Sequence, residues 1–325
     1  MGVLAASLTV AAASLVGAAA PAGAEEGSTV PVGPAGAERG SLVSVGPARI
    51  DVPGSAGKPR EEQEEALRAY WTPERVEEAV RAGDARTGKA GTMPARAAGP
   101  VPGRTIDQVG KILFNFPGGQ PGSCTGTVVD SPSGRIVITA GHCIEHGGPD
   151  GEWFTNFAFL PAYENGEEPL GLFTVANVAT DGLWASDEDE THDYGVLVIS
   201  DNAEGETVAD VAGALPLRTT PSAVTSVHVT GYPAAGGYDG RDQHHCEGLT
   251  EPTLPPRDLI WVNCPNMERG ASGGPWLHGF DATTQEGEIY GVNTILDDLG
   301  NVYTPRFDSR TLQLVSIMDM AAGAM

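Results

Sequence analysis

The sequence predicts an all-β domain over residues 105–325, preceded by a segment of different composition. Glycine and proline are abundant, with 44 and 25 residues in a chain of 325, which favours turns and short strands over long helices. Short runs of β-branched residues recur after residue 108, separated by Gly, Pro and Ser turns. Such spacing indicates a β-barrel or a β-sandwich, and not alternating strands and helices. The expected strands lie at 109–114, 126–129, 135–139, 172–178, 194–199, 224–230, 259–263, 287–295 and 302–303.

Residues 1–24 have the pattern of a secretory signal peptide. An apolar run from Val3 to Ala20 is followed by small residues at 22–24, typical of a cleavage site. A basic start is missing, because Arg39 is the first basic residue. A membrane anchor is the alternative, but the run is rich in alanine and ends in a cleavage-type motif. We therefore expect a secreted protein without membrane attachment once the signal is removed.

Residues 25–104 are expected to form a propeptide-like segment. Gly, Ala, Pro and Ser dominate 25–58, and Gly, Ala, Pro and Arg dominate 87–104, which indicates flexible linkers. Between them, Thr72-Pro73 predicts a helix start by its N-cap and first-turn proline. The apolar side of that helix consists of Val76, Ala79 and Val80, and Gly83 ends it. If the segment is removed, Arg104-Thr105 is the expected cut; the alternative is an extension that is never removed.

Helical spacing within the all-β part occurs at 309–322. We expect a C-terminal helix there that docks on the strands. The apolar side chains available for docking are Leu312, Leu314, Val315, Ile317 and Met318.

The formal charge of −24 is concentrated after residue 104. Residues 25–104 carry 12 acidic and 11 basic side chains, whereas residues 105–325 carry 31 acidic and 8 basic ones. Such an acidic surface argues against nucleic acid and anionic membranes as partners and attracts cationic polypeptides at low salt. Solubility outside the cell is the simpler explanation. The run 187–190 is best explained as a solvated loop, and a calcium site is the less favoured alternative.

The four cysteines form an even set in a chain expected to be secreted, so we expect two disulfides. Three pairings are open. Pairing Cys124 with Cys143 and Cys246 with Cys264 closes two short loops, each stabilising by roughly 3 kcal/mol. A zinc site formed by His244, His245, Cys246 and Cys264 is the alternative, but an oxidising compartment favours the disulfide.

The stretch from Gly270 to Pro275 predicts an exposed serine nucleophile. Small residues around Ser272 allow a sharp turn with little steric cover, because glycine tolerates backbone angles that other residues avoid. The backbone N–H groups of Gly270 and Ser272 then point toward the place where an oxyanion would develop. A glycine-rich surface loop is the alternative, so the prediction depends on a base and an acid elsewhere in the chain.

His142 and Asp193 supply those two groups. His142 ends an apolar strand on a glycine-loosened turn beside Cys143, where a disulfide would hold a general base in place. Asp193 lies at the mouth of another apolar strand, where a partly buried carboxylate can accept the imidazole N–H and fix its tautomer. The sequence therefore offers a base, an orienting acid and a nucleophile in the order His142, Asp193, Ser272.

These residues resemble those of the chymotrypsin-like serine peptidases, and more narrowly the bacterial secreted branch that includes the V8-like glutamyl endopeptidases. The resemblance covers 105–325 and implies two packed six-stranded antiparallel β-barrels with the three residues in the cleft between them. It also implies the disulfide between Cys124 and Cys143. The motifs that carry it are Thr139-Ala140-Gly141-His142-Cys143, His192-Asp193-Tyr194-Gly195-Val196 and Gly270-Ala271-Ser272-Gly273-Gly274-Pro275.

Two departures from the family matter for activation and specificity. The animal digestive members carry an aspartate before the nucleophile, and this chain has Ala271, so activation through that ion pair is excluded. Asn266 stands where trypsin-like members carry the aspartate that binds Arg or Lys of the substrate. Asn293 stands where glutamyl endopeptidases carry a histidine. We therefore expect a neutral substrate pocket bordered by Asn266, Asn293 and Thr294.

The resemblance implies a secreted serine endopeptidase that hydrolyses peptide bonds through an acyl-enzyme intermediate. This chemistry needs no metal and no organic cofactor. Polypeptides are the expected partners, and we expect a monomer that binds neither nucleic acid nor membrane. The alternatives are a catalytically silent binding protein with a protease fold, and an esterase that uses the same three residues.

Overall fold

The computed structural model describes Gly2 and residues 41–84, 105–220 and 222–324. The expected signal peptide lies outside the described residues apart from Gly2. The first part of the expected 25–58 linker, at 25–40, and the whole linker at 87–104 also lie outside them, so the expected cut after Arg104 is not described. Contacts divide the chain into two units, Met1–Pro34 and Ala35–Met325, and all elements described below belong to the second. Among the described residues, no helix has the length and apolar character needed to cross a bilayer.

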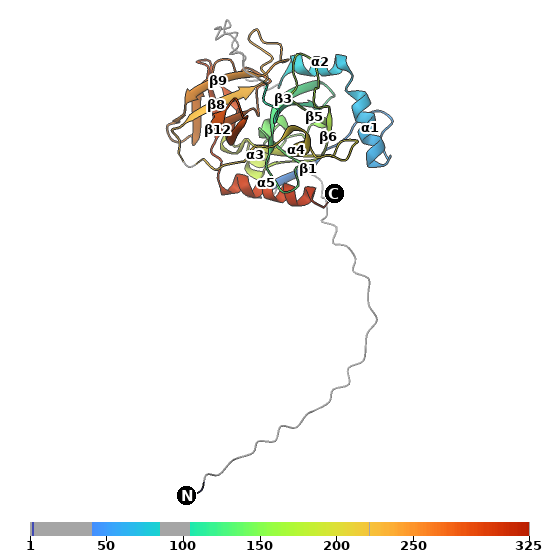
Figure 1. The fold of residues 1–325 in the computed structure, drawn as a ribbon, viewed down its shortest axis with the longest axis horizontal. Helices are drawn as coiled ribbons and strands as arrows, with labels where there is room; N and C mark the ends of the chain where they lie inside the picture. The colour runs from blue at the N-terminus through green and yellow to red at the C-terminus, as the bar shows by residue number, and fades with distance from the viewer. Residues whose placement is uncertain (1, 3–40, 85–104, 221, 325) are drawn as a thin grey trace. The chain divides into compact units, whose positions relative to one another are not determined.

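The first half of the β domain is a closed six-stranded antiparallel barrel, which confirms the predicted all-β class. Its strands follow the order β6-β5-β2-β3-β4-β7, and β6 also pairs with β7, which closes the ring. Figure 1 labels β3, β5 and β6 of this barrel. The barrel interior is filled by large apolar side chains such as Ile112, Phe159 and Leu197. The strands are β2 (Val109–Asn115), β3 (Pro121–Val129), β4 (Ile136–Thr139), β5 (Thr155–Pro161), β6 (Phe173–Asp181) and β7 (Gly195–Ile199).

The second half consists of two four-stranded antiparallel sheets around a shared apolar cluster that includes Ile260, Trp276 and Tyr290. One sheet has the order β13-β12-β8-β9 and the other has the order β10-β11-β15-β14. The strands of the first are β8 (Ser226–Gly231), β9 (His244–Leu249), β12 (Pro275–Asp281) and β13 (Glu286–Val292). Those of the second are β10 (Glu251–Pro252), β11 (Leu259–Asn263), β14 (Ile295–Leu296) and β15 (Asn301–Pro305).

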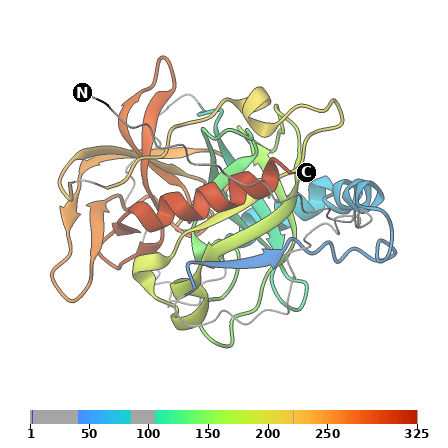
Figure 2. The same ribbon diagram turned by 90° about the horizontal axis from the view of Figure 1, so that it is seen from below.

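The predicted C-terminal helix is present as α5 (Ser309–Ala322) and crosses the strands (Figure 2). Asp308 caps its start by accepting hydrogen bonds from the backbone N–H groups of Arg310 and Thr311. The expectation for its docking side chains was partly wrong. Leu314, Val315 and Met318 are buried, whereas Leu312 and Ile317 are exposed, because helical periodicity turns those two positions away from the buried face.

Residues 41–84 contain more structure than the sequence predicted. The helix expected after Thr72 is confirmed as α2 (Pro73–Ala82), with Val76, Ala79 and Val80 buried, and α1 (Arg60–Tyr70) precedes it. The expectation of little structure at 25–58 was wrong for β1 (Val43–Pro47), which pairs antiparallel with the edge of β6. Backbone hydrogen bonds carry this pairing, so a segment rich in small residues can form it without an apolar pattern.

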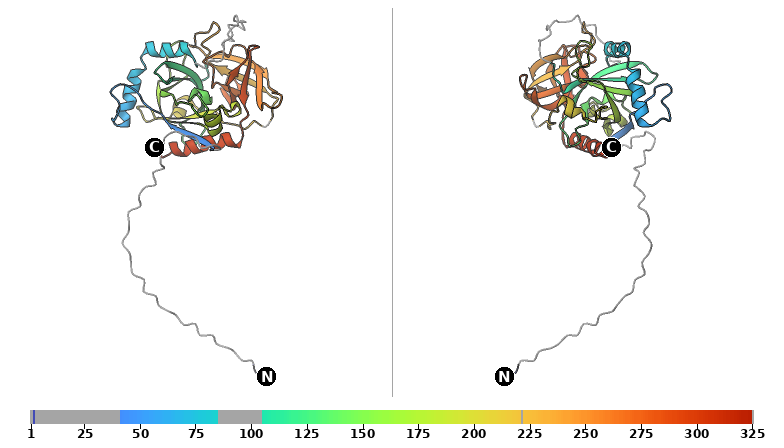
Figure 3. Two further views of the ribbon diagram at one scale, coloured as in Figure 1. Left: turned by 180° about the vertical axis from the view of Figure 1, so that it is seen from behind. Right: turned by 45° about the vertical axis from the view of Figure 1, so that its right-hand side comes forward.

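The helices α1 and α2 pack against the first barrel (Figure 3). Leu67, Trp71 and Val80 share one buried cluster with Leu113 of β2 and Leu160 of β5. The Trp71 indole N–H donates to the backbone carbonyl of Asn156 at 2.9 Å. The segment 41–84 is therefore bound to the barrel by strand pairing, apolar packing and hydrogen bonds. Short elements connect the strands of the β domain: η1 (Gly141–Cys143), α3 (Gly182–Asp187), η2 (Glu190–His192) and α4 (Val208–Ala212).

Candidate active site

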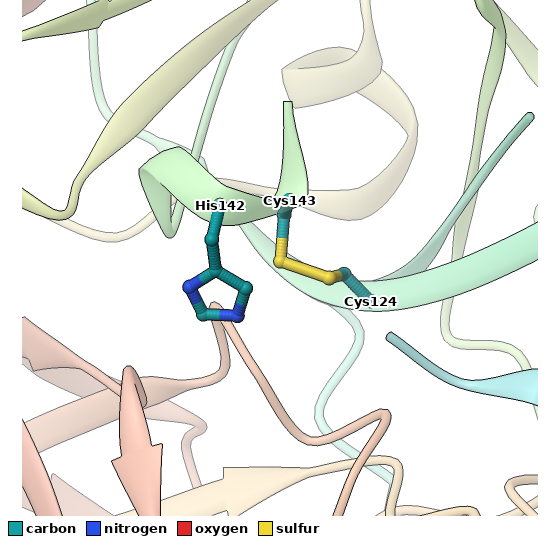
Figure 4. A group of neighbouring side chains, drawn as sticks. All are labelled: Cys124, His142 and Cys143. Carbon is teal, nitrogen blue, oxygen red and sulfur yellow. A yellow bond between two sulfur atoms is a disulfide. The ribbon is translucent and has the colours of Figure 1, made fainter. Parts of the chain in front are cut away.

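His142 lies on the turn η1, directly after β4. Its neighbour Cys143 is bonded to Cys124 of β3, which anchors the turn to an adjacent strand (Figure 4). His142 is buried, with 5% relative exposure. A buried ring on an anchored turn keeps its position, as a general base requires.

Asp193 follows η2 and precedes β7, and its carboxylate binds His142 at two points. Oδ2 lies 2.8 Å from Nδ1 of His142, and Oδ1 accepts the backbone N–H of His142 at 2.9 Å. The pairing of β4 with β7 explains the meeting. Thr139 lies opposite Gly195, so the residues just after β4 and just before β7 reach the same end of the barrel.

Ser272 lies on the turn between β11 and β12, which the other half of the domain supplies. Its backbone carbonyl accepts the N–H of Thr125 at 2.8 Å, which ties the turn to β3 of the first barrel. Gly273 has a φ of +77°, and a Cβ there would lie 2.3 Å from the carbonyl oxygen of Thr125. A glycine is therefore needed for the turn to pack closely against β3.

A carboxylate from outside the β domain joins these groups. Oδ2 of Asp84 accepts the Ser272 hydroxyl and lies 3.2 Å from Nε2 of His142. Oδ1 of Asp84 accepts the backbone N–H of Gly270 at 2.9 Å. The Asp84 side chain, which directly follows α2 and Gly83, therefore contacts the predicted nucleophile, the predicted base and one predicted oxyanion donor.

Burial and hydrogen bonding act in opposite directions on the Asp84 carboxyl. Burial alone raises its pKa, but the hydrogen bond and charge of His142, together with the hydrogen bonds from Ser272 and Gly270, lower it below the usual value. The carboxyl is consequently held as a carboxylate, and it favours the protonated form of the imidazole beside it.

Similarity to known proteins is found among solved structures. No family model and no curated protein matches the sequence. Among solved structures, the protease Anisep from Arthrobacter nicotinovorans is 30% identical with a TM-score of 0.60, over 68% of this chain and 97% of that chain. The chain belongs to the chymotrypsin-like serine proteases. The thermostable serine protease AL20 from an extremophilic microorganism is 29% identical with a TM-score of 0.62, over 66% of this chain and 98% of that chain.

A narrower position within the family stays a prediction. A Glu endopeptidase is 16% identical with a TM-score of 0.52, over 66% of this chain and 91% of that chain, and this likeness shows the fold alone. The V8-like branch is compatible with these similarities and rests on the sequence motifs.

The two predicted disulfides are confirmed as Cys124–Cys143 and Cys246–Cys264. The second bond removes both thiolates from the zinc alternative. Cys124, His142 and Cys143 also have their donor atoms within 4.8 Å of one another, but both sulfur atoms are bonded in the disulfide (Figure 4). In the acidic run, Asp189 caps η2 and lies 3.2 Å from His192, and Glu190 pairs with Arg257 at 2.7 Å.

The residues predicted to border the substrate pocket are buried in the second half of the domain. The amide of Asn293 donates to the carbonyls of Thr230 and Ala271, and its oxygen accepts the indole N–H of Trp276. These bonds brace the strand end beside Ser272. Asn266 donates to the carbonyl of His245 at 3.0 Å, and Thr294 donates to that of Tyr303 at 3.0 Å.

Asp84 is the site residue that the sequence reasoning missed. The sequence predicts the end of a helix at Gly83, and the single acidic residue that follows it carries no motif. The turn at Gly83 was the available signal, since a helix that ends on glycine redirects the chain. A distance of 186 residues along the chain separates Asp84 from Gly270, so its place at the site follows from tertiary docking.

Proposed function

We propose that this chain is a secreted serine endopeptidase that hydrolyses polypeptides through Ser272, His142 and Asp193. The observation that carries the proposal is the meeting of Ser272 Oγ, His142 Nε2 and the Gly270 N–H at one carboxylate, with Asp193 bound to the far side of the imidazole. Membership of the family supports peptide bonds as the substrate class. Residues 1–24 are proposed to direct export, and the two disulfides fit an oxidising compartment.

The proposed reaction begins when Asp84 has left the site. Ser272 Oγ attacks a peptide carbonyl carbon while His142 Nε2 takes the hydroxyl proton. Asp193 accepts the Nδ1–H, which fixes the tautomer and stabilises the imidazolium. His142 then gives the proton to the leaving amine, and a water molecule hydrolyses the acyl-enzyme by the same steps in reverse order.

The Asp84 carboxylate supports the proposed position of the oxyanion site, because one of its oxygens binds the Gly270 N–H. The Gly270 N–H donates at 2.9 Å to a carboxylate oxygen, so the backbone there is already oriented toward a negatively charged oxygen. Gly270 has a φ of +93°, and a Cβ would lie 2.6 Å from the carbonyl oxygen of Tyr232, which explains why glycine occupies this position. The Ser272 N–H is the proposed second donor.

The test compares the exported wild-type chain with Ser272→Ala, His142→Ala and Asp193→Asn variants on a proteome-derived peptide library. We expect kcat to fall about a million-fold for the first two variants and about ten-thousand-fold for the third. Ser316→Ala, which replaces an exposed serine on α5, serves as the matched control and keeps full activity. The mature N-terminus, read by mass spectrometry, tests removal of residues 1–24.

Two outcomes replace the proposal. If wild type leaves every peptide intact after the N-terminal segment has been removed, the silent binding protein takes its place. If wild type hydrolyses esters but no peptide, the chain is an esterase. A neutral pocket bordered by Asn266, Asn293 and Thr294 predicts cuts that follow neither acidic nor basic residues.

A further inference from the structure

The segment 41–84 meets the catalytic groups with a side chain. The atoms that contact Ser272 and His142 are the carboxylate oxygens of Asp84, and the same carboxylate takes the Gly270 N–H. A carboxylate has no leaving group for Ser272 to displace. The segment therefore occupies the reaction centre with a group that the proposed reaction cannot cleave.

A backbone hydrogen bond at Gly83 fixes the path along which the chain brings Asp84 to the catalytic groups. The carbonyl of Gly83 accepts the N–H of Ser123 on β3 at 3.0 Å. Gly83 has a φ of +60°, and a Cβ there would lie 3.1 Å from the nitrogen of Gly270. Glycine therefore lets the chain pass close to the nucleophile turn and sends the next side chain into the site.

The groups around Asp84 favour an anion. His142 lies on one side. Burial lowers the pKa of Lys111 on β2 to about 7, and the charge of Asp84 acts against this shift because it attracts the protonated amine. Lys111 donates to the carbonyl of Gly240 at 3.2 Å, and the negative charge of Asp239 also attracts its protonated amine. Asp193, beyond the imidazole, is the acidic group on the opposite side. The imidazole of His142 lies between the carboxylates of Asp84 and Asp193, and its protonated form would balance one of their two charges.

Docking elsewhere holds the segment in place. Val80 of α2 and Trp71 are buried in the apolar cluster that also contains Leu113 of β2. Glu77 pairs with Arg241 of the loop between β8 and β9. At the other end, β1 pairs with β6, and Arg310 of α5 donates to the carbonyl of Ser41 at 2.7 Å. These contacts span the segment from residue 41 to residue 84, so breaking the chain after Asp84 leaves all of them intact.

We propose that residues 41–84 form an intramolecular inhibitor in which the Asp84 carboxylate occupies the oxyanion site and bridges Ser272 and His142. This inference rests on the proposed endopeptidase function. Inhibition ends when the segment dissociates or is degraded, and cutting the linker at 85–104 alone does not end it.

The experiment measures how fast a fluorophosphonate probe labels Ser272 in the full-length chain, with mass spectrometry confirming that the labelled species is unprocessed. We expect Asp84→Ala to react at least about tenfold faster than wild type, since its methyl side chain cannot reach the Gly270 N–H or His142. Asp84→Asn keeps the side-chain shape and removes the charge, so it carries the test if Asp84→Ala does not fold. Glu78→Gln, which changes an exposed acid on α2, is the control and reacts as wild type does.

Three results distinguish failure of the inhibitor from failure of the enzyme. The inhibitor proposal is overturned if the full-length wild type reacts as fast as a chain whose segment 41–84 has been degraded by an added protease. It is also overturned if the degraded chain reacts fast while both folded Asp84 variants react as slowly as wild type. If no form reacts with the probe and none cleaves peptides, the endopeptidase function itself has failed.

Discussion

Replacing Trp71 by alanine tests whether apolar docking holds the inhibitory segment on the barrel. Trp71 is 4% exposed, lies at the junction of α1 and α2, and donates its indole N–H to Asn156 at 2.9 Å. Loss of a buried tryptophan costs about 3–5 kcal/mol, and this range includes part of the lost hydrogen bond. We take about 4 kcal/mol as the loss in docking free energy, which corresponds to about a thousandfold shift toward the undocked segment.

Hydrogen exchange measures this shift directly. In a Ser272→Ala background, which prevents self-cleavage, we expect the amides of α2 in Trp71→Ala to exchange up to about a thousandfold faster. The amides of β2 and β3 should change little, because the barrel has its own core of Ile112, Phe159 and Leu197. Glu78→Ala is the control on α2. A rise of less than about tenfold in α2, with a folded barrel, would refute the reasoning that Trp71 anchors the segment.

Two further predictions concern acid and the first disulfide. Docking lowers the Asp84 pKa, so its stabilisation is fully present above the ordinary value of 3.8 and declines as pH falls through the lowered pKa. The test compares the Tm of the Ser272→Ala chain with that of the same chain that also carries Asp84→Asn. The difference between the two Tm values should shrink below about pH 4. A difference that stays constant from about pH 3 to about pH 7 would contradict this. The disulfide Cys124–Cys143 joins residues that are 19 positions apart. Its removal by the double substitution Cys124→Ala and Cys143→Ala should lower the free energy of unfolding by about 3 kcal/mol in urea titrations. An unchanged unfolding midpoint would show that the turn of His142 does not depend on it.

The sequence carried much of the information about the two halves of the site. His142 and Asp193 were predicted at the ends of apolar strands, and these strands, β4 and β7, are neighbours in the barrel. The glycines around Ser272 were predicted from turn chemistry, and the positive φ values at Gly270 and Gly273 agree with that reasoning. Local pattern was sufficient there because each residue lies beside the element that positions it.

The features that the sequence did not reveal depend on distant partners. Asp84 acquires its role through α2 packing on the barrel, and no local pattern marks the carboxylate. The strand β1 pairs through backbone groups in a stretch without apolar alternation, so composition suggested a linker. The bonds of Asn293 to Thr230, Ala271 and Trp276 likewise come from three places in the chain. Spacing along the sequence does not encode such combinations.

The pairing of β1 with β6 has a consequence for the barrel if residues 41–84 are removed. Val43–Pro47 cover the backbone of Asn177–Asp181 along the edge of β6. If residues 41–84 leave, these five positions lose their partner on that side, while Asn177–Thr180 keep their pairing with β7. The freed side becomes an open sheet edge on which another extended chain can add a strand. Residues 105–325 carry 31 acidic and 8 basic side chains, and this excess of negative charge would oppose pairing of that edge with a second copy.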